Sequence, residues 1–142
     1  MADTLVVEKS VEIAATPAKV WEALTDPAKV KQYLFGTNMS ADWRVGGRIT
    51  YSGEWEGKQY VDGGEILELV PEKILKSTYW SSMSGTEDKP ENYVNVTYAL
   101  EEISGGTKLT VIQDNNKTAD SAEHSGNNWQ MVLDALKKVC EG

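Results

Sequence analysis

Residues 120–141 carry the one long helical pattern in this sequence. The apolar side chains of this run recur at the spacing of one face of an α-helix, and the polar side chains fall largely on the other face. The apolar face consists of Trp129, Val132, Leu133, Leu136, Val139 and Cys140. A helix with such a face must cover another hydrophobic surface. Most of the preceding chain has the pattern of short β-strands, so we predict one antiparallel sheet wrapped around this terminal helix.

The segment that begins the chain predicts one strand followed by two short helices. Residues 4–14 are rich in the β-branched side chains typical of strands. Two pairs of a capping residue and a proline follow, Thr16 with Pro17 and Asp26 with Pro27. Each pair is the signal for the first turn of a helix. We therefore expect two consecutive short helices between the first strand and the rest of the sheet.

The middle of the chain predicts about six further strands. Apolar and polar residues alternate through much of residues 41–113, as they do in strands with one covered face. Glycines at 56–58 and 104–106 predict hairpin turns, and those at 62–64 predict a turn or a bulge. Residues 114–123 are polar and predict a connector into the long helix. The predicted fold class is α+β, with a sheet layer and a helix layer.

Length and charge restrict the classes of protein to which this chain can belong. At 142 residues we expect a single domain over residues 1–142. The net charge of −8 would repel a phosphate backbone, so nucleic acid is not an expected partner. No apolar stretch approaches the roughly 18 residues of a membrane span. The N-terminus lacks a signal-peptide pattern and the single cysteine fits a reducing compartment, so we expect the cytoplasm.

Residues that commonly carry catalysis are scarce. His124 and Cys140 are the only histidine and cysteine, which leaves too few ligands for an ordinary zinc site. Cys140 lies on the apolar face at the C-terminal end of the predicted helix, where the helix dipole does not favour a thiolate. The glycine pairs are not followed by the residues of a phosphate-binding loop. We expect no catalytic residue, no metal and no cofactor.

The aromatic side chains are the unusual feature, because the chain has five tryptophans and six tyrosines but one phenylalanine. Such rings can fill a core, or they can line a cavity between sheet and helix; the sequence leaves both open. In the second case, strand alternation and the helical face together select the candidate ligand-binding residues. These candidates are Tyr51, Trp55, Tyr79, Val96, Tyr98, Gln113, Trp129, Val132 and Leu133.

Four stretches of the chain resemble one family in combination. They read TPAKVWEALTDP (16–27), DWRVGGRITYSGEWEGKQYVDGGEILELVPEKIL (42–75), YVNVTYALEEISGGTKLTV (93–111) and NWQMVLDALKK (128–138). Together they resemble the START-like superfamily, in particular the branch homologous to the C-terminal domain of the activator of the heat-shock-protein-90 ATPase. The resemblance implies a helix-grip fold, a bent antiparallel sheet that grips the long C-terminal helix around a cavity.

The resemblance also implies a range of functions, because such families include carriers of small hydrophobic ligands, polyketide cyclases and aromatases, and chaperone regulators. We predict a non-catalytic protein that binds a small hydrophobic or aromatic molecule. Two alternatives stay open. One is a co-chaperone-like regulator in the stress response, for which exposed aromatics such as Trp43 or Tyr60 could form the contact patch. The other is a cyclase-type enzyme that needs only one or two polar groups in its cavity.

Overall fold

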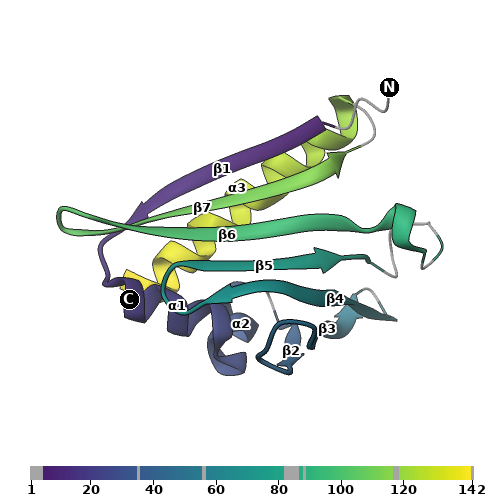
Figure 1. The fold of residues 1–142 in the computed structure, drawn as a ribbon, viewed down its shortest axis with the longest axis horizontal. Helices are drawn as coiled ribbons and strands as arrows, with labels where there is room; N and C mark the ends of the chain where they lie inside the picture. Colours follow the sequence, from purple (N-terminus) through teal and green to yellow (C-terminus); the bar gives the residue numbers. More distant parts are fainter. Residues whose placement is uncertain are drawn as a thin grey trace.

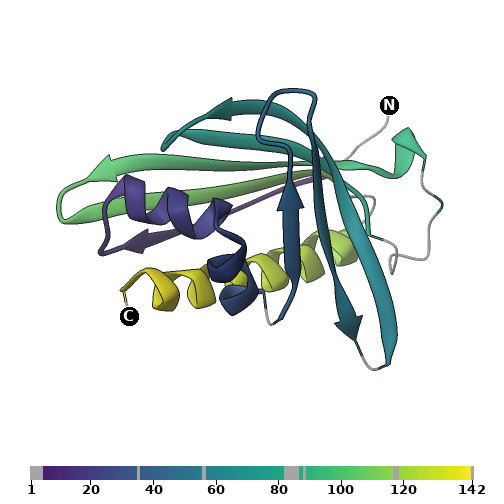
Figure 2. The same ribbon diagram turned by 90° about the horizontal axis from the view of Figure 1, so that it is seen from below.

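A strongly curved antiparallel sheet wraps around the long C-terminal helix. The computed structural model describes residues 5–34, 36–55, 57–81, 87, 89–116 and 119–141. Within these residues seven strands form one sheet in the order β1-β7-β6-β5-β4-β3-β2. All three α-helices lie on one side of the sheet, with α3 running diagonally across it (Figures 1 and 2). This arrangement confirms the predicted α+β class and the helix-grip architecture.

The order of elements along the chain follows the prediction. The elements are β1 (Leu5–Ile13), α1 (Pro17–Thr25), α2 (Pro27–Tyr33), β2 (Asn38–Ala41), β3 (Arg48–Trp55), β4 (Lys58–Val70), β5 (Ile74–Tyr79), the 3-10 turn η1 (Pro90–Asn92), β6 (Val94–Ile103), β7 (Gly106–Asn116) and α3 (Ala119–Glu141). Each strand is paired antiparallel with its neighbours in the sheet.

The two short helices begin where the capping signals predicted. The Thr16 hydroxyl accepts a hydrogen bond from the backbone N–H of Lys19 at 3.3 Å, and the Asp26 carboxylate accepts one from the N–H of Ala28 at 3.0 Å. A proline occupies the first turn of each helix. Backbone N–H groups in the first turn have no intrahelical acceptor, so the N–H that proline lacks costs no hydrogen bond there. These caps fix α1 and α2 against the C-terminal end of α3.

The predicted turn at 62–64 is wrong, because β4 runs through these residues. Gly63 has a φ of +151°, and a Cβ there would collide with the Ile49 carbonyl oxygen of β3. A Cβ on Gly64 would collide with the Thr78 carbonyl oxygen of β5. The glycine pair therefore allows close approach of both neighbouring strands within one bent strand. The register irregularity of β4 against β5 falls later, between Ile66 and Glu68.

The predicted polar connector at 114–123 is also wrong, since β7 continues to Asn116 and α3 begins at Ala119. The Asp114 carboxylate accepts hydrogen bonds from the backbone N–H and the side-chain amide of Asn95 on β6, at 2.6 and 2.7 Å. These polar residues extend the sheet through side-chain bonds, which hydrophobic alternation does not reveal. The short strand β2 was likewise absent from the prediction, which began the strands after the two short helices at residue 41.

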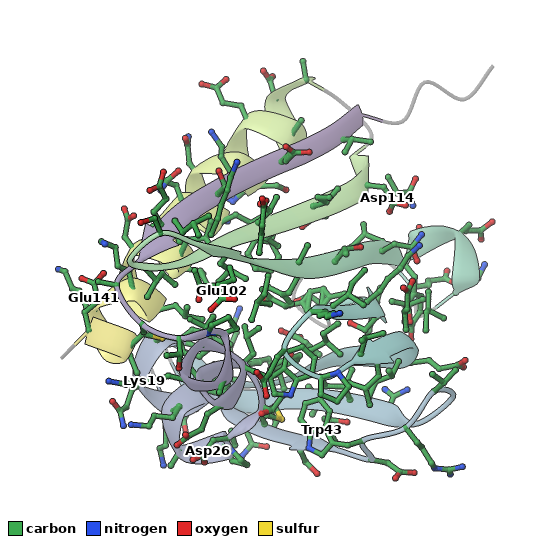
Figure 3. The ribbon with its side chains drawn as sticks, turned by 60° about the vertical axis from the view of Figure 1, so that its left-hand side comes forward. Lys19, Asp26, Trp43, Glu102, Asp114 and Glu141 are labelled. Atoms are coloured by element: carbon green, nitrogen blue, oxygen red, sulfur yellow. The ribbon has the colours of Figure 1, made fainter. Side chains whose placement is uncertain are left out.

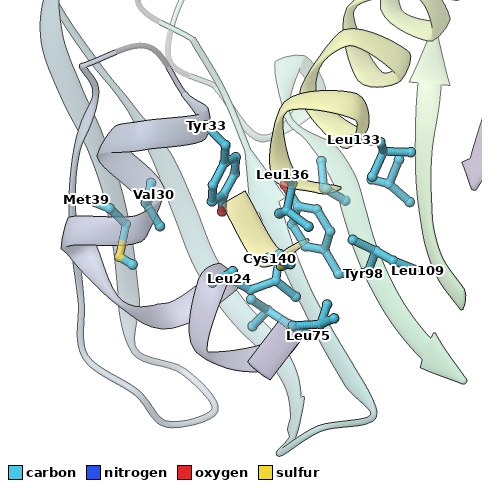
Figure 4. Close-up of a cluster of buried hydrophobic side chains, with 14 of the residues drawn as sticks. Leu24, Val30, Tyr33, Met39, Leu75, Tyr98, Leu109, Leu133, Leu136 and Cys140 are labelled. Carbon is cyan, nitrogen blue, oxygen red and sulfur yellow. The ribbon is translucent and has the colours of Figure 1, made fainter. Parts of the chain in front are cut away.

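The fully buried core lies at the C-terminal half of α3 (Figure 4). Leu133, Leu136 and Cys140 point from this half of the helix into a cluster with side chains of α1, α2 and the sheet. That cluster includes Leu24, Val30, Tyr33, Leu75, Tyr98 and Leu109. Trp129, at the other end of the apolar face, is only partly buried.

Charged side chains labelled in Figure 3, such as Lys19, Glu102 and Glu141, are exposed. Among the described helices, none is long and apolar enough to cross a membrane.

Candidate functional site

A cavity of about 410 Å³ lies between the N-terminal half of α3 and the concave face of the sheet. Its volume falls within the range of about 300–1,000 Å³ that is usual for small-molecule sites. Its walls combine aromatic, aliphatic and polar side chains. They are Leu34, Thr37, Tyr51, Tyr60, Asp62, Ser77, Tyr79, Val96, Tyr98, Gln113, Ser125, Asn128, Trp129 and Val132.

Strand alternation explains how the sheet supplies these side chains. Ser77 and Tyr79 on β5 are two residues apart, and so are Val96 and Tyr98 on β6, which places each pair on one face. Cross-strand pairing then brings Ser77 opposite Val96, and Val96 opposite Gln113. A continuous row of side chains therefore crosses β5, β6 and β7 on the side that faces α3.

Two ring pairs border the cavity. The rings of Tyr51 and Tyr79 lie 6.4 Å apart between centroids, with planes at 60°. The rings of Tyr98 and Trp129 lie 5.9 Å apart, with planes at 84°. Both arrangements are the edge-to-face geometry that aromatic quadrupoles favour. A ligand between these pairs would meet aromatic carbon from more than one direction.

Three tyrosine hydroxyls of this wall, those of Tyr51, Tyr79 and Tyr98, remain protonated because their pKa values are raised. Burial raises the pKa of Tyr51 and Tyr98 well above the ordinary range, because the phenolate would be desolvated. Burial also raises the pKa of Tyr79, and the negative charge of Asp62 adds to the effect. The Tyr79 hydroxyl donates a hydrogen bond to Asp62 Oδ2 at 3.0 Å. The wall thus offers neutral phenols and one carboxylate.

A hydroxyl pair closes one side of the cavity. The Tyr60 and Thr37 hydroxyls are 2.6 Å apart and share a hydrogen bond that joins β4 to the segment after α2. Tyr60 pairs across the strands with Gly53, and a Cβ on Gly53 would lie 2.6 Å from the Tyr60 hydroxyl oxygen. Gly53 therefore leaves the space that the Tyr60 ring occupies.

A second polar contact joins α3 to the sheet. The indole N–H of Trp129 donates to Gln113 Oε1 at 2.7 Å, and Gln113 Nε2 donates to the Ser125 hydroxyl at 3.4 Å. Gln113 is one of the candidate ligand-binding residues from the sequence, and it lines the cavity. Its amide also holds the Trp129 indole in the cavity wall, so Gln113 positions another lining residue.

Comparison with known proteins agrees with this architecture. Residues 14–141 match the family model described as "Activator of Hsp90 ATPase homolog 1-like protein". The chain belongs to this family. No curated protein matches the chain significantly.

Several solved structures share this fold. The solution structure of ChR145 from Cytophaga hutchinsonii is 41% identical with a TM-score of 0.82, over 94% of this chain and 92% of that one. The Aha1 dimer from Colwellia psychrerythraea is 21% identical with a TM-score of 0.75, over 96% of both chains. DynU16, from the dynemicin biosynthetic locus, is 21% identical with a TM-score of 0.77, over 94% of this chain and 46% of that one.

In this family member, the structure brings most of the sequence candidates to one place. Tyr51, Tyr79, Val96, Tyr98, Gln113, Trp129 and Val132 line the cavity. Leu133 does not line it, because it is fully buried in the core below. The side chain of Trp55 lies outside the described residues.

The sequence analysis missed the polar part of the wall, which includes Thr37, Asp62, Ser77, Ser125 and Asn128. A signal existed for two of these residues. Ser77 lies between Leu75 and Tyr79 in the alternation of β5, and Ser125 precedes Trp129 by one helical turn. We selected apolar and aromatic positions on each face and passed over the small polar ones. Tyr60, which we had considered for an exposed contact patch, is half-buried and faces the cavity.

The remaining candidates for chemistry lie elsewhere. Among the described residues, no group of three or more His, Cys, Asp and Glu side chains is placed to hold a metal ion. Cys140 is buried in the core, and this burial raises the pKa of its thiol. His124 is exposed, with its Nε2 3.2 Å from the side-chain nitrogen of Asn128.

Proposed function

We propose that the protein binds a small, mostly apolar molecule in the cavity between α3 and the sheet. The observation that carries this proposal is an aromatic-walled space of about 410 Å³ beside a core cluster of buried hydrophobic side chains. An open space lined with aromatic rings allows an apolar ligand to bury its surface against those rings. Burial contributes about 25 cal/mol per Å² before the costs of ordering are subtracted.

The polar groups of the wall would orient such a ligand. Asp62 and Ser77 lie on the sheet side, and Asn128 lies on the helix side. A few convergent polar groups in a mostly apolar pocket are typical of sites that select one orientation. The ligand of this proposal therefore has an apolar body and one polar end.

Calorimetric titration with a neutral aromatic probe, naphthylmethanol, tests the proposal. Phenylalanine in place of Val132 would fill part of the cavity from the helix side. We expect Val132→Phe to weaken binding at least about tenfold, because the probe and the new ring occupy the same volume. The matched control is Met131→Phe, at the adjacent helix position, where the native side chain is 52% exposed. Equal binding by both variants, or no binding by the native protein, would contradict the proposal.

A cyclase-type activity is the second candidate, favoured by the hydrogen-bonded pair of Asp62 and Tyr79 inside the cavity. A carboxylate and a phenol that face a bound poly-β-ketone could orient it and assist one proton transfer. The likeness to DynU16 is a likeness of fold. Turnover of a poly-β-ketone that is lost in Asp62→Asn would favour this second candidate over simple binding.

A further inference from the structure

The polar end of the proposed ligand can be narrowed from the charge of the cavity wall. Among the described residues that line the cavity, none is Lys, Arg or His. Asp62 is the only acidic side chain among them, and it is 8% exposed. The phenols of Tyr51, Tyr79 and Tyr98 stay neutral, as described above. The wall therefore holds one acidic side chain at a defined place.

Aromatic rings flank this carboxylate on two sides. Tyr51 is the direct cross-strand partner of Asp62, which places their Cβ atoms roughly 5 Å apart. Tyr79 reaches Asp62 from β5 through its hydroxyl. The two rings are also edge-to-face neighbours of one another, at 6.4 Å. A group held beside Asp62 is thus also held beside two electron-rich rings.

From this arrangement we infer that the ligand carries a protonated amine, which binds between the Asp62 carboxylate and the rings of Tyr51 and Tyr79. The inference rests on the proposed function and specifies its ligand class. A cation gains a charge-assisted hydrogen bond from the carboxylate and an attraction to the negative ring faces. The desolvation of Asp62 is a property of the folded protein, so the ligand adds only the desolvation of its own amine.

The same arrangement disfavours anionic ligands such as fatty acids. A ligand carboxylate in this cavity would lie near Asp62, and no Lys, Arg or His among the described lining residues would offset its charge. The net charge of −8 acts in the same direction, because it attracts cations to the protein and repels anions.

Three probes of one shape test the inference. Naphthylmethylamine, naphthylmethanol and naphthoate share an aromatic body and differ in the charge of the polar end. They are titrated into the full chain by calorimetry at about pH 8, where the amine probe is mainly protonated and the carboxylic acid probe is ionised. We expect the amine to bind about tenfold more tightly than the alcohol, and the acid about tenfold more weakly than the alcohol.

Two variants assign the preference to Asp62. In Asp62→Asn the side chain still accepts a hydrogen bond from Tyr79, and we expect the amine and the alcohol to bind equally. Glu68→Gln is the matched control, because it removes one carboxylate from the exposed face of the same strand; it should keep the full preference. An unchanged near-ultraviolet circular dichroism spectrum of Asp62→Asn shows that the aromatic wall is intact.

The outcomes separate the two proposals. Binding of the alcohol without a preference for the amine would overturn this inference and leave the proposed function standing. An amine preference that survives in Asp62→Asn would overturn it as well. Failure of all three probes to bind would overturn the proposed function, and the inference with it.

Discussion

The two halves of α3 face the same sheet and yet have different surroundings. In the C-terminal half, Leu133, Leu136 and Cys140 are fully buried against the sheet, α1 and α2. In the N-terminal half, Ser125, Asn128 and Trp129 border an open cavity. One continuous helix therefore serves as a core element at one end and as the wall of a site at the other.

The difference between the halves lies in what anchors their side chains. Aliphatic side chains interdigitate wherever space allows, so the C-terminal half packs closely with the residues of α1 and α2. In the N-terminal half, hydrogen bonds tie the rings to the walls: Trp129 to Gln113, Tyr79 to Asp62, and Tyr60 to Thr37. Rings held by their polar atoms cannot collapse inward without losing those bonds. The cavity is maintained by bonds at its edges.

The largest effect on stability should come from the packed half. Leu136 is fully buried, and Leu136→Ala should lower the free energy of unfolding by about 3 kcal/mol, through lost burial and the void left behind. Denaturant titration measures the change. A loss below about 1 kcal/mol would show that this half is not closely packed.

Truncation of a side chain in the N-terminal half of α3 should lower stability less, and ligand binding more, than truncation in the C-terminal half. Trp129 already borders empty space, so Trp129→Ala should lower the free energy of unfolding by about 2 kcal/mol, below the 3–5 typical of buried rings. The same change should abolish binding of naphthylmethanol. Trp129→Phe is the control, since it keeps a ring in the wall. If Trp129→Ala cost more stability than Leu136→Ala, the distinction between the two halves would fail.

Removal of one anchoring bond should have a smaller effect. Tyr79→Phe keeps the ring and deletes the hydroxyl that donates to Asp62, so we expect a loss of about 1–2 kcal/mol. Thermal unfolding of this variant beside the native protein would measure it. Stability equal to that of the native protein would show that the Tyr79–Asp62 bond does not hold the wall.

The smallest effect should appear at the exposed C-terminal end of α3, and it should disappear in acid. The backbone N–H of Ala14 and, next, the ammonium of Lys137 lower the pKa of Glu141 below its ordinary value. A lowered folded pKa means that Glu141 contributes stability above the ordinary carboxyl range, and that this contribution disappears as the pH falls through the folded pKa. Glu141→Gln should therefore lower the melting temperature near neutral pH and converge with the native protein in acid. A constant difference at every pH would contradict this.

The sequence predicted the parts of the fold that depend on periodicity. The face of α3 from Trp129 to Cys140 and the capped starts at Thr16 and Asp26 could be found because each has a local signature. The course of β4 through Gly63 and Gly64 could not be predicted, because glycine is needed there to make room for backbone carbonyls of the neighbouring strands. Close approach between strands is a property of the assembled sheet and leaves only an ambiguous local signal.

The candidate site likewise has one part that the sequence predicts and one part that it does not. The cavity-facing positions of Tyr51, Tyr79, Val96 and Tyr98 follow from alternation once the strands are known. The place of Asp62 does not, because an acidic residue beside two glycines is typical of a surface turn. In the fold it is buried and accepts a hydrogen bond from Tyr79, a residue 17 positions away. The hydrophobic pattern of a sequence identifies the apolar walls of a cavity. Buried polar groups can be identified only in the folded structure, where their hydrogen-bond partners are known.

The absence of a side chain at Gly53 has a consequence for engineering. Because the end of the Tyr60 ring lies against this glycine, a Cβ at position 53 would force the ring to shift. Alanine there would displace the phenol and change the shape of the cavity wall. The cavity is therefore adjustable at a backbone position that does not itself line it, and a library of small substitutions at Gly53 would test which ligands tolerate the change.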